Sequence, residues 1–527
     1  MIKLLKFFSV FFLIMGVGLF GYTQSDYWVF FTDKQGTSFN PYDYFDSKAI
    51  ERRVIHGISL YDSTDYPLNQ TYVKAISDKV TAVNFQSRWF NAVAVNATST
   101  QIAEIMNLAF VKQIRPVQLN LVTAGVATFD YRLNADESEL IKNQLNHMQG
   151  NLFIANGISG KGVRIAVFDA GFPSVDKNPV FEHIITNNRI IATYDFARKR
   201  DYVYAFNTHG TMVLSCIAGK IDTLQLGLAT DAEFLLARTE IESEVYSEEE
   251  NWLAAAEWAD KLGADIINSS LGYTYHRYFP FEMDGNISLV AKAASLASNK
   301  GILVINAMGN DGNKDWKILA TPADADSVLS IGGINPSTNL HADFSSFGPS
   351  ADFRLKPNLV AFGTAVVANR SKLAVAQGTS FATPLVTGFA ACVLQLNPLF
   401  TNMQLKNALQ ESGSLYPYAD YAHGYGIPQA SYFVANNIKL DSAKTYSIIL
   451  NNNIANIQVN NEFLQIKQHS TPGYLYVNIK NQNKQIIKYW VIEVFSKDVI
   501  SLDLTEFEDA ESINVFYKGY YNAYKLK

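Results

Sequence analysis

The stretch SLVAKAASLASNKGILVINAMGN, residues 288–310, decides the fold class. Its first half predicts a helix that ends at Gly301, and its second half predicts a buried strand, because its apolar residues follow one another without alternation. The same succession recurs from about residue 160 onward, in VRIAVFD (163–169), FLLARTE (234–240) and ADIINSSLG (264–272). Repeated units of this kind predict an α/β fold of three layers, in which helices cover both faces of a mostly parallel central sheet.

Different patterns flank this α/β region, which we place at residues 138–437. Residues 25–122 combine a helix with strands such as FNAVAVNA (90–97) and predict a small α+β module. Residues 440–527 contain short alternating runs punctuated by Asn, Gly and Lys, which predict a small β-sandwich.

Length and charge limit the possible classes of protein. A chain of 527 residues exceeds what one hydrophobic core usually organises, so two or three domains are expected. The formal net charge of −6 shows no basic field, which argues against nucleic acid as a partner.

The N-terminus, MIKLLKFFSVFFLIMGVGLFGYTQS, has two lysines, then an apolar run, then small and polar residues. This order predicts a signal peptide over residues 1–24 and a secreted or cell-surface protein. An uncleaved membrane anchor is the alternative, although the run is shorter than the roughly 20 residues that a spanning helix needs.

Only two cysteines, Cys216 and Cys392, occur in this chain. Both lie inside apolar helical patterns, so we expect two buried free thiols rather than a disulfide.

Polar residues that end buried strands mark the expected ligand-binding edge of an open α/β sheet. Asp169 ends IAVFD, and Gly309 and Asn310 follow ILVINAM. His209 stands in NTHGTMVLSCIAG at the expected start of a helix, where the helix dipole favours neutral imidazole. Each of these residues taken alone has an ordinary explanation as a capping or turn residue.

Ser380 lies in AQGTSFATPLVTGFAA, residues 376–391. Pro384 is tolerated near a helix start, and this places Ser380 on the first turn, where its backbone N–H has no intrahelical acceptor. That N–H could stabilise a developing oxyanion. The alternative is a serine that only caps the helix.

Taken together, DAG, HGT, GN and GTSxATP occur in an order that resembles the subtilisin-like serine proteases, the subtilases of peptidase family S8. SSLG (269–272), TPADADSVLSIGGIN and KPNLVAFGT extend the resemblance over about residues 140–435. Residues 130–172 look like the mature N-terminal region of Bacteroidetes secreted subtilases.

The resemblance implies a role for each matching position. Ser380 would be the nucleophile, His209 the general base, Asp169 the residue that orients His209, and Asn310 the side-chain oxyanion donor. It also implies a substrate-binding strand that includes Ser270, Leu271 and Gly272. Met308 and Asp311 flank the turn of Gly309 and Asn310, so our hypothesis is that they line the pocket before the scissile bond and that Asp311 favours a basic or polar residue there.

Two positions depart from the pattern of the family. Ala170 stands where the family usually has Ser or Thr, and Met212 stands where it often has a second histidine. Neither departure replaces a triad member, but the lost hydroxyl leaves the positioning of Asp169 in doubt.

The flanking modules also have family counterparts. Residues 25–122 look similar to the inhibitory propeptide of subtilases, which implies cleavage between about residues 118 and 135. The last ninety residues resemble either a sorting domain of the type IX secretion route, with secretion machinery as a partner, or a simple accessory β-domain.

The expected function is therefore that of a secreted serine endopeptidase, with proteins or peptides as substrates and its own propeptide as an intramolecular inhibitor. The alternative is a catalytically silent surface module that binds a partner. No cofactor is expected for catalysis, and structural calcium is possible without assigned ligands, because no Asp-rich calcium loop occurs.

Overall fold

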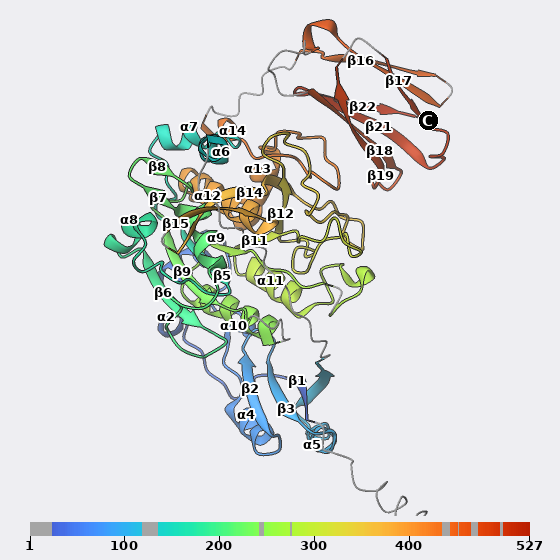
Figure 1. Cartoon of the computed structure of the whole chain (residues 1–527). Helices are drawn as coiled ribbons and strands as arrows, with labels where there is room; N and C mark the ends of the chain where they lie inside the picture. Colours follow the sequence, from blue (N-terminus) through green and yellow to red (C-terminus); the bar gives the residue numbers. More distant parts are fainter. Residues whose placement is uncertain are drawn as a thin grey trace, which may run out of the picture. The chain divides into compact units, whose positions relative to one another are not determined.

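The computed structural model describes residues 24–117, 135–241, 247–274, 277–370, 372–434, 443–451, 453–464, 473–495 and 499–526 (Figure 1). The chain forms two compact units, of which one holds Met1–Tyr44 and Leu60–Leu119 and the other holds Phe45–Ser59 and Asn120–Lys527. The predicted signal peptide lies outside the described residues, except for its last position.

The smaller unit is an α+β module. Helices α4 (Gln70–Ser77) and α5 (Ser99–Ile105) share one apolar core with an antiparallel sheet of order β2-β3-β1-β4. Thr98 caps α5 in a capping box with Gln101, which explains where that helix begins. The strands are β1 (Ser25–Phe31), β2 (Ala82–Ser87), β3 (Ala92–Ala97) and β4 (Val111–Pro116).

The larger unit is built on a parallel sheet of seven strands, in the order β13-β12-β11-β10-β5-β9-β6, which confirms the predicted fold class. The apolar stretches of the sequence form its centre, and the side chains of β5, β10 and β11 are buried. The strands are β5 (Arg164–Asp169), β6 (Ile190–Asp195), β9 (Glu233–Arg238), β10 (Ile266–Ser269), β11 (Leu303–Ala307), β12 (Leu329–Ile334) and β13 (Leu359–Phe362).

Helices form two layers around this sheet (Figure 1). Helices α9 (His209–Ala218) and α12 (Thr379–Leu396) pack together on one side, and α10 (Ser247–Lys261) and α11 (Leu289–Asn299) pack together on the other. Smaller elements complete the unit: α3 (Ser47–Ile55), α6 (Ala135–Asn146), α7 (Gly150–Ala155), α8 (Glu182–Thr186), α13 (Asn402–Glu411), α14 (Ser431–Val434) and the hairpin β14 (Thr364–Asn369) and β15 (Lys372–Gln377).

The C-terminal region consists of two antiparallel sheets that share one hydrophobic core, as the sandwich prediction requires. The sheets have the orders β16-β17-β20 and β19-β18-β21-β22. The hairpin of β21 (Ala510–Tyr517) and β22 (Tyr520–Lys525) was not predicted: its turn residues Lys518 and Gly519 both have positive φ, but lysine is not a usual turn signal. The other strands are β16 (Tyr446–Asn451), β17 (Ile454–Val459), β18 (Gly473–Asn481), β19 (Ile486–Val494) and β20 (Ile500–Asp503).

Both cysteines are free and buried in the core of the larger unit, which confirms that prediction. Within the described residues, one helix, α12, is long and apolar enough to cross a membrane, and 83% of that helix is buried inside the protein. The apolar side chains of α12 therefore belong to the hydrophobic core of the larger unit.

Candidate active site

The four residues singled out at strand and helix ends all lie at the carboxyl edge of the parallel sheet. Asp169 is the last residue of β5, and Asn310 follows β11. His209 is the first residue of α9, as predicted, and Ser380 is the second residue of α12. Parallel strands bring their carboxyl ends to one edge, so distant parts of the sequence meet there.

Asp169 and His209 form a buried pair. His209 Nδ1 lies 2.9 Å from Asp169 Oδ1 and 3.0 Å from Oδ2. The backbone N–H of Ala170 donates to Asp169 Oδ1 at 2.8 Å, so the carboxylate keeps a local donor although the usual hydroxyl is absent. A Cβ on Gly210 would lie 2.4 Å from the Gly171 carbonyl, so only glycine lets α9 approach β5 this closely.

Charges around His209 favour its protonated form, contrary to the neutral imidazole expected from the helix dipole. Burial lowers the pKa of His209, but the carboxylates of Asp169 and Glu240 outweigh burial and hold this pKa above its ordinary value. Glu240 follows β9 and accepts hydrogen bonds from Tyr273 and Thr239, both at 3.0 Å. Burial raises the pKa of Glu240 to about 7.

Asn310 is held in one orientation by the start of α12. Its Oδ1 accepts from the Thr379 backbone N–H at 2.9 Å and from the Thr379 hydroxyl at 3.0 Å. These two bonds fix the amide so that Nδ2, which contacts no described acceptor, is free to donate. Sequence reasoning did not single out Thr379, although it lies next to Ser380, because its partner is 69 positions away.

Ser380 is anchored by two reciprocal hydrogen bonds with Ser270. Ser270 Oγ donates to the Ser380 carbonyl at 2.9 Å, and Ser380 Oγ donates to the Ser270 carbonyl at 3.1 Å. Pro384 has no N–H for the Ser380 carbonyl, so this carbonyl is available to Ser270. Ser380 Oγ makes no hydrogen bond to His209, but the rings of His209 and Phe381 have centroids 5.6 Å apart, which places the imidazole beside this turn.

The segment Ser270, Leu271 and Gly272 continues β10 beyond its paired residues. Ser270 is buried, whereas Gly272 is exposed. The backbone N–H groups of Leu271 and Gly272 donate to no described residue. This stretch therefore has main-chain groups available to an added strand.

The three residues around Asn310 have different surroundings. Met308 is fully buried against Leu319 and Ala323, so its side chain packs in a small core. Gly309 donates its N–H to the Thr379 hydroxyl at 3.3 Å. The carboxylate of Asp311 is already paired with Lys314, whose Nζ lies 2.8 Å from Oδ1.

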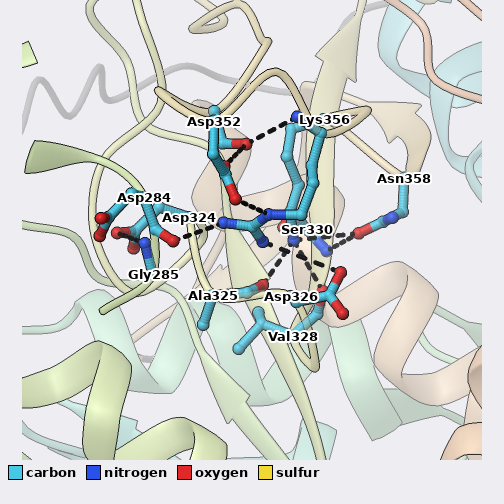
Figure 2. Close-up of polar contacts among 12 residues, drawn as sticks. Asp284, Gly285, Asp324, Ala325, Asp326, Val328, Ser330, Asp352, Lys356 and Asn358 are labelled. Carbon is cyan, nitrogen blue, oxygen red and sulfur yellow. Dashed lines mark hydrogen bonds and ion pairs between the residues drawn. The ribbon is translucent and has the colours of Figure 1, made fainter. Parts of the chain in front are cut away.

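The buried side chain of Lys356 binds the end of the loop that precedes β12 and the start of that strand (Figure 2). Lys356 Nζ donates to the Ala325 and Val328 carbonyls at 2.8 and 2.9 Å and to the Ser330 hydroxyl at 2.7 Å. Burial lowers the pKa of Lys356 well below its ordinary value. Ser330 is the second residue of β12, so these bonds fix the amino end of that strand.

Two protein-family models match this chain. Residues 160–426, about half of the chain, match the subtilase family, peptidase S8, and they include all four residues at the carboxyl edge. The chain belongs to the subtilase family. Residues 26–128 match the peptidase S8 propeptide domain of Bacteroidota, so this subtilase carries a propeptide.

Several curated subtilases are similar to this one. The minor extracellular protease Epr of Bacillus subtilis (strain 168) is 26% identical over 370 residues, which cover 68% of this chain and 52% of Epr. Subtilisin NAT of Bacillus subtilis subsp. natto is 30% identical over 52% of this chain and 66% of the relative, and subtilisin of Bacillus pumilus is 30% identical over 52% and 91%. The chain thus spans about half the length of Epr and less than two thirds of subtilisin NAT. The solved structure of Sphericase aligns with a TM-score of 0.44 and 26% identity over 52% of this chain and 92% of that chain.

Subtilases commonly need no cofactor for catalysis and often bind structural calcium. In the part of this subtilase that the structure describes, no group of three or more His, Cys, Asp or Glu side chains is placed to hold a metal ion.

Proposed function

We propose that this subtilase is a serine endopeptidase that hydrolyses peptide bonds through an acyl-enzyme on Ser380. The observation that carries the proposal is the buried Asp169–His209 pair beside the first turn of α12. A serine hydroxyl near its free pKa is a weak nucleophile and needs an adjacent base held in one tautomer.

The proposed reaction begins when Ser380 Oγ leaves the Ser270 carbonyl and turns to His209 Nε2. His209 takes the proton, Oγ attacks the substrate carbonyl, and His209 then gives the proton to the leaving amine. In the second half of the reaction, His209 takes a proton from a water molecule that attacks the acyl-enzyme. His209 then returns the proton to Ser380 Oγ as the acyl group leaves. Asn310 Nδ2 and the Ser380 backbone N–H, both without described partners, would stabilise the oxyanion.

The substrate would be an extended polypeptide that adds a strand along Ser270, Leu271 and Gly272. Main-chain hydrogen bonds would then supply affinity, and side-chain pockets would supply preference. Asp311 is proposed to favour a basic or polar residue before the scissile bond, in competition with its ion pair to Lys314. Peptide-library cleavage that is unchanged in Asp311→Ala would dismiss this preference.

We also propose the fate of the flanking regions. The N-terminal signal would direct export to the outside or surface of the cell, and cleavage between about residues 118 and 135 would separate the inhibitory propeptide. The C-terminal sandwich would direct sorting, anchor the protein at the cell surface or bind a partner. A hydrogen bond from Asn478 Nδ2 to the Ala419 carbonyl, at 2.7 Å, supports its role as a docked accessory domain.

A fluorophosphonate probe tests the catalytic proposal. We expect covalent labelling of the processed protein, loss of labelling in Ser380→Ala, and normal labelling in Ser337→Ala, which changes an exposed turn serine. Correctly processed and folded protein that is never labelled would instead support the silent binding module.

A further inference from the structure

Residues 45–59 lie within the propeptide match but belong to the other compact unit. The family model of the propeptide covers residues 26–128, whereas Phe45–Ser59 groups with the peptidase region and the residues on both sides of it form a separate unit. Its helix α3 is capped by Asp46, whose side chain accepts from the Lys48 backbone N–H at 2.9 Å.

Buried ion pairs attach this segment to helix α10. Arg52 and Arg53 both pair with Asp260, and the three side chains are 2%, 0% and 2% exposed. The Arg53 Nη2 to Asp260 Oδ2 distance is 2.6 Å. A buried charge that loses its partner is strongly unfavourable, so neither side of this contact is suited to solvent.

The segment also satisfies backbone groups at the ends of two helices. Arg52 Nε donates to the Lys300 carbonyl at 3.1 Å at the end of α11, and the Asp46 N–H donates to the Lys261 carbonyl at 2.9 Å at the end of α10. A Cβ on Gly263 would lie 2.7 Å from the Ala49 backbone nitrogen, so the surface of the peptidase region is shaped to admit α3.

The contact lies at the edge of the sheet opposite the candidate active site. Asp46 pairs with Arg164, the first residue of β5, at 3.2 Å, whereas Asp169 is the last residue of that strand. Lys48 pairs with Asp265, just before β10, at 3.0 Å. Six residues of strand separate the two edges by roughly 16 Å, so α3 does not occupy the substrate-binding strand.

We propose that residues 45–59 are a permanent anchor, which keeps the propeptide bound to the peptidase after the connecting chain has been cut. The anchor binds an interaction surface formed by Asp260, Gly263, Ala264, Asp265 and Lys300. It holds the cleaved inhibitor at high effective concentration without using the active site. The proposal rests on the proposed function only for the identity of the protease that makes the cut.

The experiment therefore uses full-length Ser380→Ala protein with a site for an added sequence-specific protease placed within residues 118–134. After cutting, gel filtration and native mass spectrometry are expected to find the fragment that contains residues 45–59 still bound. Hydrogen exchange of residues 47–55 is expected to be unchanged by the cut. Release of the fragment, or loss of this protection while the fragment stays bound, would overturn the proposal.

Variants locate the anchor. Arg53→Ala is expected to weaken retention of the fragment by roughly 100-fold or more, because Asp260 loses a buried partner. Lys48→Ala, which removes a partly exposed pair, is expected to weaken retention by less than about fivefold. Lys74→Ala, at an exposed pair with Asp78, is the matched control and is expected to change nothing. Retention of the fragment in Arg53→Ala equal to that of the parent would contradict the proposal. If Arg53→Ala does not fold, the hydrogen exchange of the cut parent protein tests whether the fragment stays anchored.

Discussion

The two edges of the parallel sheet treat their polar side chains differently. At the carboxyl edge, His209 Nε2 and Asn310 Nδ2 have no hydrogen-bond partner among the described residues. At the amino edge, Arg52, Arg53 and Asp260 are buried in ion pairs with one another. The carboxyl edge therefore has polar atoms that are available to a ligand. At the amino edge the charged side chains are already paired with one another.

If the carboxyl edge is the active site, as proposed, this difference separates catalysis from stability along the same strands. An unpaired polar group in a largely buried place costs free energy, and such groups are retained where chemistry uses them. Changes at the carboxyl edge should therefore reduce turnover with little effect on folding. Changes at the amino edge should do the opposite.

The largest effect is expected for Asp169→Asn. The amide keeps the shape of the side chain but stabilises the wrong tautomer of His209, so kcat on a peptide substrate should fall by about 10⁴-fold. Far-ultraviolet circular dichroism and the urea midpoint should stay close to those of the parent. Asp201→Asn, at an exposed position, is the control. A loss of less than tenfold would exclude Asp169 from the proposed role.

At the amino edge, Asp260→Asn should lower the free energy of unfolding by about 3–5 kcal/mol, because two buried guanidinium groups lose their carboxylate. Urea unfolding in a Ser380→Ala background measures this without self-digestion. In the active background, kcat should stay within about twofold of the parent, since α3 lies away from the reacting groups. Asp78→Asn is the matched exposed control, and equal urea midpoints for both variants would contradict the assignment.

A substitution at Asn310 can test the hydrogen-bond donor of this side chain separately from its acceptor. Asn310→Asp keeps an oxygen for Thr379 but removes the Nδ2 donor, so kcat should fall by about 10²–10³-fold with little change in KM. The pair of values is measured by steady-state kinetics on one peptide substrate. A rise in KM at constant kcat would instead indicate a binding residue.

A smaller loss is expected for Thr379→Val, which removes the hydroxyl that orients Asn310. One net hydrogen bond of this kind corresponds to roughly a tenfold decrease in kcat. Thr379→Ser should restore kcat to within about twofold, since it keeps the hydroxyl. A Ser variant no better than Val would show that the methyl group, rather than the hydroxyl, matters.

The pH dependence of turnover should show the charges near His209. In the proposed mechanism the neutral form of His209 is the active one. Because the pKa of His209 lies above its ordinary value, kcat/KM should fall as the pH drops through a midpoint above 6.5. Glu240→Gln removes a charge that raises this pKa and should move the acid midpoint to lower pH. Glu182→Gln, at an exposed site, should leave it in place. Coincident profiles for all three proteins would rule out an influence of Glu240.

Much of the fold could be predicted, because a strand of a parallel sheet that is buried on both faces has a continuous run of apolar residues in its sequence. The stretches 163–169 and 264–272 contain strands β5 and β10, and the stretch 234–240 covers all of β9 except its first residue. The helix before ILVINAMGN ends just before Gly301. The candidate site was readable for a related reason: its residues stand where apolar runs stop. The turn of β21 and β22 escaped prediction because Lys518 adopts a backbone conformation usually taken by Gly or Asn.

The supporting contacts could not be read from sequence. Ser270 and Ser380 exchange hydrogen bonds across 110 positions, and Arg52 meets Asp260 across 208. No local pattern links such pairs, because each residue satisfies the periodicity of its own element. The grouping of residues 45–59 with the peptidase unit is of this kind, since the segment looks like any short amphipathic helix within the propeptide.

The two free thiols lie on the helices whose first turns hold the proposed base and nucleophile: Cys216 on α9 with His209, and Cys392 on α12 with Ser380. Burial raises the pKa of both thiols, so each stays protonated and unreactive while its helix is packed. A thiol reagent can therefore modify them only when the core opens. Their rate of modification would therefore measure the local opening of α9 and α12 in the native protein, without any added probe group.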